Sequence, residues 1–150
     1  MGMSVPPPVA NVMRHQPAIG ERIQAFPFLT VSEDGFPHVC LLSAAETDVD
    51  ATGDEIHIAL ASAHTRSNLL RTGHATLITV DDVTAHYCRL VVARTIEREG
   101  VLGAVLSVVG HKADTVGIPL EPLSLETSGE LALLENWERS ARVLAALSHT

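Results

Sequence analysis

Short apolar runs separated by polar turns occupy the first two thirds of the chain. Their β-branched content and alternation predict strands over residues 28–32, 38–45, 56–61, 75–80 and 86–97. Glu33-Asp34-Gly35 predicts a hairpin turn after the first strand, because glycine can adopt the positive φ that such turns need. Residues 101–109 are apolar at nearly every position, so periodicity leaves strand and helix both open there.

Apolar residues recur at helical spacing in three segments, residues 19–26, 65–72 and 131–147. Pro27 is placed to end the first helix and Gly73 to end the second. Thr127 and Glu130 have the spacing of a capping box before the third. The pattern therefore predicts a mainly β chain with flanking helices and a C-terminal helix.

The remaining segments are expected to be loops or edges. Residues 1–12 contain three consecutive prolines, which predict a flexible, extended arm. Residues 47–53 are rich in Asp and Gly and are interpreted as a loop, and residues 118–125 as a sheet edge or a loop. The whole chain, residues 1–150, is expected to form a single domain.

Composition narrows the class of protein. The chain is 46% hydrophobic but only 3% aromatic, so its core must be built from Val, Leu, Ile and Ala. A net charge of -8 argues against a nucleic-acid partner. No apolar run approaches the ~20 residues of a membrane span, and no basic leader precedes one, so a cytoplasmic protein is expected. Cys40 and Cys88 are expected to be reduced and unbridged.

Charge reverses locally between residues 56 and 80. This stretch has no Asp or Glu but contains two arginines and three histidines, in a chain that is otherwise acidic. Within it, Ser62-Ala63-His64-Thr65-Arg66-Ser67-Asn68 leaves a predicted strand and enters a predicted helix. Free N–H groups, hydroxyls and Arg66 together suit an anion such as a phosphate. The alternative is that Thr65 only caps the helix and Arg66 is solvated.

Other chemistry has weaker support. His38 and Cys40 share one strand face and could begin a metal site with His57 or Cys88, but the spacing is unspecific and no metal is expected. A nucleophilic cysteine would need a base that the sequence does not locate. Catalytic residues therefore stay unassigned.

The run from residue 28 to residue 97 resembles the pyridoxamine 5′-phosphate oxidase-like, FMN-binding split-barrel family. The resemblance is carried in order by Phe-Leu-Thr-Val, Glu-Asp-Gly-Phe-Pro-His, Ile-His-Ile-Ala-Leu-Ala, Thr-Arg-Ser-Asn-Leu-Leu-Arg and Ala-Thr-Leu-Ile-Thr-Val. It implies a six-stranded split β-barrel with flanking helices. It also implies a homodimer that holds flavin at the subunit interface.

In relatives that bind FMN, a Ser and a basic residue before an Asn-Leu pair hold the phosphate. Here Ala63 and Thr65 stand at those positions. Ser43 stands where the family has a basic residue, near the end of the strand that begins at His38. With the flanking residues, the cofactor site is expected to comprise His38, Ser43, Ser62, His64, Thr65, Arg66, Ser67 and Asn68. FMN is the expected cofactor, with a deazaflavin, haem or no cofactor as the alternatives.

Three functions remain open at this point. The first is a flavin-dependent oxidoreductase acting on an unidentified small molecule, in which the flavin carries the redox chemistry. The second is a non-catalytic flavin-binding dimer, and the third is a split-barrel dimer without cofactor. A true pyridoxamine-phosphate oxidase is not expected, because the chain is short and lacks an arginine-rich C-terminus.

Overall fold

The computed structural model describes residues 2–14 and 17–150. Its strands are β1 Arg22–Gln24, β2 Phe26–Val31, β3 Pro37–Leu42, β4 Thr47–Val49, β5 Glu55–Leu60, β6 His74–Asp81, β7 Thr84–Arg98, β8 Val101–Thr115 and β9 Ser124–Glu126. Its helices are α1 Pro7–Met13, α2 Ala63–Thr72, α3 Gly129–Leu134 and α4 Trp137–Leu147. In these residues, no helix is long and apolar enough to cross a membrane.

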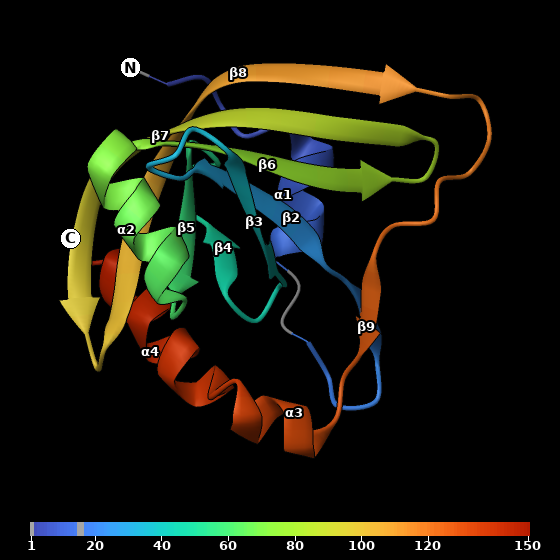
Figure 1. Ribbon diagram of the computed structural model, residues 1–150. Coiled ribbons are helices and arrows are strands. Elements are labelled where there is room, and N and C mark those ends of the chain that lie inside the picture. The colour runs from blue at the N-terminus through green and yellow to red at the C-terminus, as the bar shows by residue number, and fades with distance from the viewer. Residues whose placement is uncertain (1, 15–16) are drawn as a thin grey trace.

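Seven strands form one antiparallel sheet in the order β3-β2-β6-β7-β8-β5-β4. The two 15-residue strands β7 and β8 carry register shifts at Arg89/Leu90 and at Val92/Arg94, and such bulges let a strand bend. The sheet therefore curls into a half-barrel (Figure 1). This confirms the mainly β split-barrel fold with a C-terminal helix.

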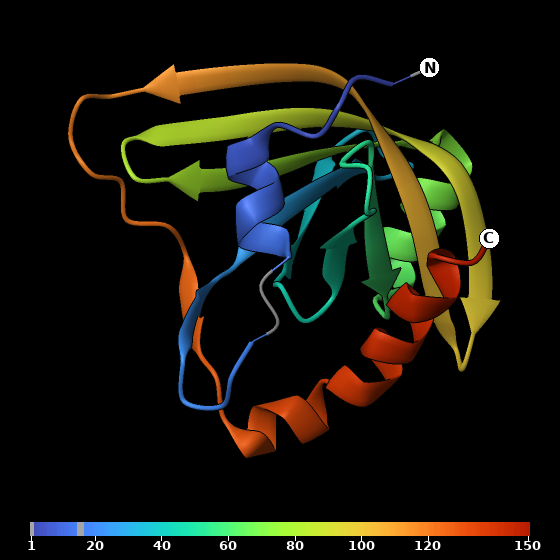
Figure 2. The same cartoon turned by 180° about the vertical axis from the view of Figure 1, so that it is seen from behind.

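The strand count differs from the six expected. β4 lies in the segment interpreted as a loop, where Thr47, Asp48 and Val49 pair with β5. Residues 101–109, which periodicity left open, lie in strand β8. A separate two-stranded sheet, β1 with β9, stands apart from the barrel (Figure 2).

The main core lies on the inner face of the curled sheet. Phe26 and Phe28 of β2 point inward at alternate positions, as do Leu77 of β6 and Leu90 of β7, and all four are at most 1% exposed. α1 and α2 pack against this face from two sides, and α2 contributes the fully buried Leu69. The two helices thus fix the inner face and leave the outer face of β2 and β3 uncovered by them.

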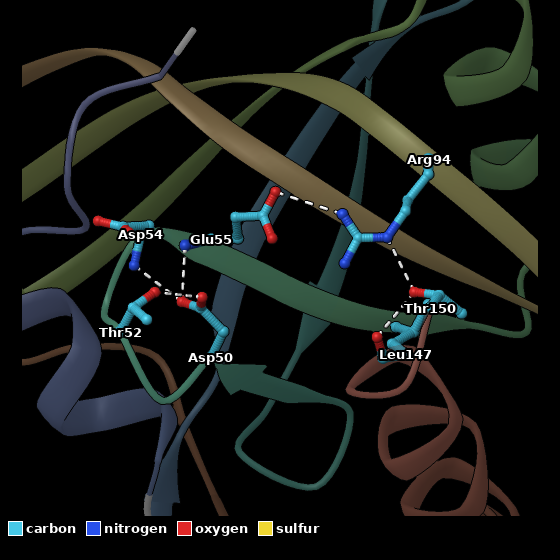
Figure 3. A network of polar contacts seen from close by, with 7 residues as sticks. All are labelled: Asp50, Thr52, Asp54, Glu55, Arg94, Leu147 and Thr150. Carbon is cyan, nitrogen blue, oxygen red and sulfur yellow. Dashed lines mark hydrogen bonds and ion pairs between the residues drawn. The ribbon is translucent and has the colours of Figure 1, made fainter.

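α4 covers the other face of β5 and β8. Val143, Leu144 and Leu147 pack there against Val105 and Ala59. Beyond the helix, Thr150 accepts a hydrogen bond from Arg94 Nε at 2.8 Å. Arg94 also pairs with Glu55 of β5, at 3.4 Å (Figure 3). The same view shows Asp50 accepting backbone N–H bonds at the start of β5. The C-terminal helix is therefore attached to the barrel by apolar packing and by this polar network.

The helix predicted over residues 19–26 is wrong. β1 occupies residues 22–24 and pairs with β9, with Ile23 opposite Leu125, and β2 has already begun at Phe26. Pro27 lies within β2, where its ring faces outward. Pairing with strands distant in sequence overrode the helical spacing, because it buries Ile23 and Phe26 on sheet faces.

The extended arm predicted over residues 1–12 is wrong from Pro7 onward; residues 2–6 are not helical, and Met1 lies outside the described residues. Pro7–Met13 is a helix, with Val9 and Met13 buried in the core. Proline is compatible with a first helical turn, since the N–H groups there have no intrahelical partner. The prolines therefore begin α1 instead of preventing it.

The capping box assigned to Thr127 and Glu130 is displaced by one residue. Ser128 is the N-cap and accepts a hydrogen bond from Leu131 N at 3.0 Å, while the Thr127 hydroxyl bonds carbonyls of residues 18 and 21. The predicted single helix is also divided into α3 and α4. Asn136 has φ of 52° and caps α4 through Arg139 N.

Candidate functional site

The strand-to-helix turn before α2 is present, but the helix begins two residues earlier than predicted, and its N-cap is Ser62 instead of Thr65. The Ser62 hydroxyl accepts from Thr65 N at 3.5 Å, and the helix ends at Gly73, with φ of 73°, as predicted. The N–H groups of the first turn have no partner within a helix, and the helix dipole places positive charge there. Ala63 and His64 therefore present backbone donors at this end.

Two histidines meet beside this helix end. The rings of His38, from β3, and His64, from α2, have centroids 3.9 Å apart. His64 Nε2 also lies 3.0 Å from the hydroxyl oxygen of Ser32, which follows β2. The β2–β3 hairpin and α2 thus bring two imidazoles and a hydroxyl together.

Asn68 and Arg71 continue the site along α2. Asn68 is buried and its amide donates to Thr30 Oγ1 at 3.1 Å. Arg71 donates to Asn68 Oδ1 at 3.2 Å and to the carbonyl of Val31. A cavity of about 320 Å³ opens here, lined by Ser32, Glu33, Asp34, His64, Ser67, Asn68 and Arg71. Ser32 and Arg71 were not predicted, although Arg71 lies three residues after Asn68 and so shares its helix face.

Arg66 turns to a different neighbour. Its guanidinium donates to the carbonyl of Gly100, in the turn between β7 and β8, at 2.9 Å and pairs with Glu97, near the end of β7, at 3.2 Å. The Glu97 side chain is 68% exposed, and an ion pair this exposed contributes only about 0–1 kcal/mol. Arg66 is therefore engaged weakly, within the same helix turn as His64.

Ser43 lies away from the other predicted residues. It is buried just beyond the end of β3, about 17 Å along the strand direction from His38 at ~3.4 Å per residue. Its hydroxyl donates to Glu46 Oε2 at 2.8 Å, and its N–H donates to the same oxygen at 2.7 Å. The fold uses Ser43 to bind this carboxylate.

Thr65, in the first turn of α2, is fully buried and lies against Cys40 of β3. Burial raises the pKa of the Cys40 thiol, against the opposing effect of the Thr65 hydroxyl. Both Cys40 and Cys88 are free thiols. In residues 2–14 and 17–150, no group of three or more His, Cys, Asp or Glu side chains is arranged to hold a metal ion.

β3 is an edge strand of the seven-stranded sheet, so half of its backbone groups point away from β2. Its outward-facing Val39 and Leu41 are 51% and 54% exposed. On the same outer face, an apolar groove of about 480 Å³ runs over β2, β6 and β7 between Val31 and Val91. The edge and the groove together offer backbone donors next to apolar surface.

Comparison with known proteins identifies the fold. No known family model matches the sequence. The uncharacterized protein YclD of Bacillus subtilis (strain 168) is 40% identical over 68 residues, which are 45% of this chain and 44% of YclD. The match thus spans less than half of that relative's length.

Solved structures match over more of the chain. The styrene monooxygenase flavin reductase of Pseudomonas putida S12 superposes with a TM-score of 0.53 and 10% identity, over 69% of this chain and 88% of the reductase. HupZ of Group A Streptococcus superposes with a TM-score of 0.55 and 11% identity, over 73% of this chain and 99% of HupZ. An F420 reductase superposes with a TM-score of 0.51 and 13% identity, over 65% of this chain and 98% of the reductase. The chain has the FMN-binding split-barrel fold that these proteins share.

Proposed function

We propose that this protein binds FMN, with the phosphate at the start of α2, and acts as a flavin-dependent oxidoreductase on a small molecule. The observation that carries the proposal is the donor-rich end of α2, beside the His38–His64 pair, on a fold shared with flavin reductases. The cytoplasm is the proposed location, and the two free thiols are compatible with it.

The residues present fit a phosphate. Hydrogen-bond donors gather near this helix end: the first-turn N–H groups, the Ser62 and Ser67 hydroxyls and the imidazoles of His38 and His64. Arg66 can join them by exchanging the exposed Glu97 for the phosphate, since a dianion attracts a guanidinium more strongly than one carboxylate does.

Bound flavin would supply hydride or electron transfer, and the protein would supply binding and orientation. The unpaired backbone groups of edge strand β3 are suited to hydrogen-bond the polar edge of the ring system. The outward side chains of Val39 and Leu41 give it apolar contact. No side chain has to transfer a proton in this scheme.

We also propose that the protein is a homodimer joined through the outer face of β2, β3 and the adjoining strands. Val31, Val39, Leu41 and Val109 are each about half exposed on this face. Contiguous apolar surface of this kind is typical of interaction sites. A partner here would cover the groove and enclose a ring bound along β3.

The test is an absorbance spectrum of freshly purified protein, followed by titration with FMN and with riboflavin. We expect flavin bands or saturable FMN binding, with weaker binding of riboflavin because it lacks the phosphate. Oxidation of a reduced nicotinamide by the loaded protein would then distinguish an enzyme from a passive carrier. Failure of both flavins to bind would instead favour a cofactor-free dimer, in which Arg66 serves only its contact with Glu97.

A further inference from the structure

A second histidine pair lies at the far end of the sheet, where β7 begins and β8 ends, on the opposite side of the molecule from α2 (Figure 1). His86 Nδ1 is 2.9 Å from His111 Nε2, and the rings are nearly parallel, at 15°. His86 is only 5% exposed, whereas His111 is exposed. The pair thus joins a fixed imidazole to one that is open to solvent and free to rotate.

The distance between the two nitrogens suits one metal ion as well as one hydrogen bond. Two nitrogens bound at about 2.0–2.1 Å lie about 2.9 Å apart when the angle at the ion is about 90°, and about 3.4 Å apart at a tetrahedral angle. The observed 2.9 Å is the length of an ordinary hydrogen bond, and it also equals the span of two ligands at right angles on one ion. Ni²⁺ and Cu²⁺ are bound in square-planar or tetragonal sites with such angles, and imidazole is a suitable ligand for both.

Two buried atoms near the pair have no hydrogen-bond partner among the described residues: His86 Nε2 and the hydroxyl oxygen of Thr79. Thr79 of β6 is paired directly with His86, so their Cβ atoms are about 4.5–5.5 Å apart on one face. In the free protein, Nδ1–H of His86 can donate to His111, which leaves Nε2 as a bare acceptor. A metal on Nδ1 moves that proton to Nε2, and the Thr79 oxygen is the acceptor within reach of a small side-chain rotation.

The neighbouring side chains favour a cation at this pair. The carboxylate of Asp81, on β6, lies close enough to His86 to attract positive charge there. Cys88 lies opposite His111 in the β7–β8 ladder and is buried.

We propose that His86 and His111 form a chelating site for a divalent transition-metal ion, Ni²⁺ or Cu²⁺, with Thr79 orienting His86 and water completing the coordination. The site is independent of the proposed flavin site, since it uses other strands and the opposite end of the sheet. An ion bound there would link β7 to β8 beyond the last apolar layer of the core.

Calorimetric titration of tag-free protein with Ni²⁺ tests the proposal, because Cu²⁺ would oxidise the two thiols. We expect one Ni²⁺ per chain, and at least a tenfold loss of affinity in His111→Ala, whose exposed side chain can be removed without unfolding. Thr79→Val should lower the affinity about tenfold, and Thr79→Ser, which keeps the hydroxyl, should restore it. His149→Ala removes another exposed histidine and should bind as the wild type does. Equal affinity in His111→Ala and His149→Ala would overturn the chelate, and equal affinity in Thr79→Val and the wild type would remove Thr79 from it.

Discussion

Glu46 follows the end of β3 and turns back to accept two hydrogen bonds from Ser43. Burial raises the pKa of Glu46 from 4.5 to about 6, and the bonds from Ser43 only partly oppose this. A carboxyl group whose folded pKa exceeds its unfolded pKa prefers to be protonated in the folded state. Its contribution to stability is therefore present below about pH 4.5 and is lost as the pH rises through about 6.

We predict that Glu46→Gln raises the free energy of unfolding at pH 7.5 by about 1–2 kcal/mol, the scale of a shift of this size. The amide oxygen of Gln can accept the same bonds from Ser43 without a charge. Urea denaturation of both proteins at pH 7.5 and at pH 4 measures the effect. The free energies of unfolding of the two proteins should converge at pH 4. An equal difference at both pH values would assign the effect to packing.

Arg66 lies in the first turn of α2, as the sequence predicts, but its guanidinium contacts Gly100 and Glu97. Its ion pair with Glu97 competes with the phosphate for the guanidinium. We predict that Arg66→Ala weakens FMN binding by roughly 1.5–3 kcal/mol, about one to two decades in Kd, and leaves riboflavin binding unchanged.

Glu97→Gln is the matched variant and should strengthen FMN binding by up to about fivefold, because it removes the competing carboxylate. Fluorescence titration with both flavins measures all four affinities. Unchanged FMN affinity in both variants would leave Arg66 as a link to the β7–β8 turn only.

The attachment of α4 depends on a glycine in β8. A Cβ on Gly103 would lie 2.9 Å from Val143 Cγ1 and 3.0 Å from Ile96 Cγ1, closer than packed carbons approach. Because these branched side chains are held by buried packing, the helix would have to move away from the strand. Gly103 therefore sets how closely α4 approaches the sheet.

We predict that Gly103→Ala lowers the free energy of unfolding by about 1–3 kcal/mol, the usual cost of overpacking. Gly110→Ala, in the same strand, is the control. Its Cβ would meet atoms no closer than 3.5 Å, an ordinary contact. Thermal denaturation of the two variants should separate them, and equal Tm values would show that α4 adjusts without cost.

The whole molecule presents one sheet face to solvent while helices cover much of the remainder. This outer face carries the proposed dimer interface and the groove beside β3. We predict that sedimentation equilibrium finds twice the mass of one chain at micromolar concentration. Leu41→Glu should give the mass of one chain, because it places a charge on the apolar face that the proposed interface buries. Glu138→Gln, an exposed change on α4, should leave the dimer intact.

Sequence patterns located the elements that depend on local interactions. The sequence predicted strands β2, β3, β5, β6 and β7, the turn at Gly35, and helix α2 with its end at Gly73. Burial with a period of two and glycines with positive φ depend on neighbouring residues, so a local pattern is enough to find them. For the same reason the turn that holds Ser62, His64 and Asn68 was found. The lack of Asp and Glu over residues 56–80 is the second sequence signal for this turn.

Tertiary structure decided what depends on distant partners. Residues 19–26 have helical spacing but become strand, because β9 lies about a hundred residues away and supplies the pairing. The prolines begin a helix because the core offers α1 a place to bury Val9. Arg66 faces Glu97 because the end of β7 lies beside α2. His86 meets His111 because β7 pairs with β8. Each of these outcomes depends on the free energy of nonlocal burial and pairing, which no short stretch of sequence contains.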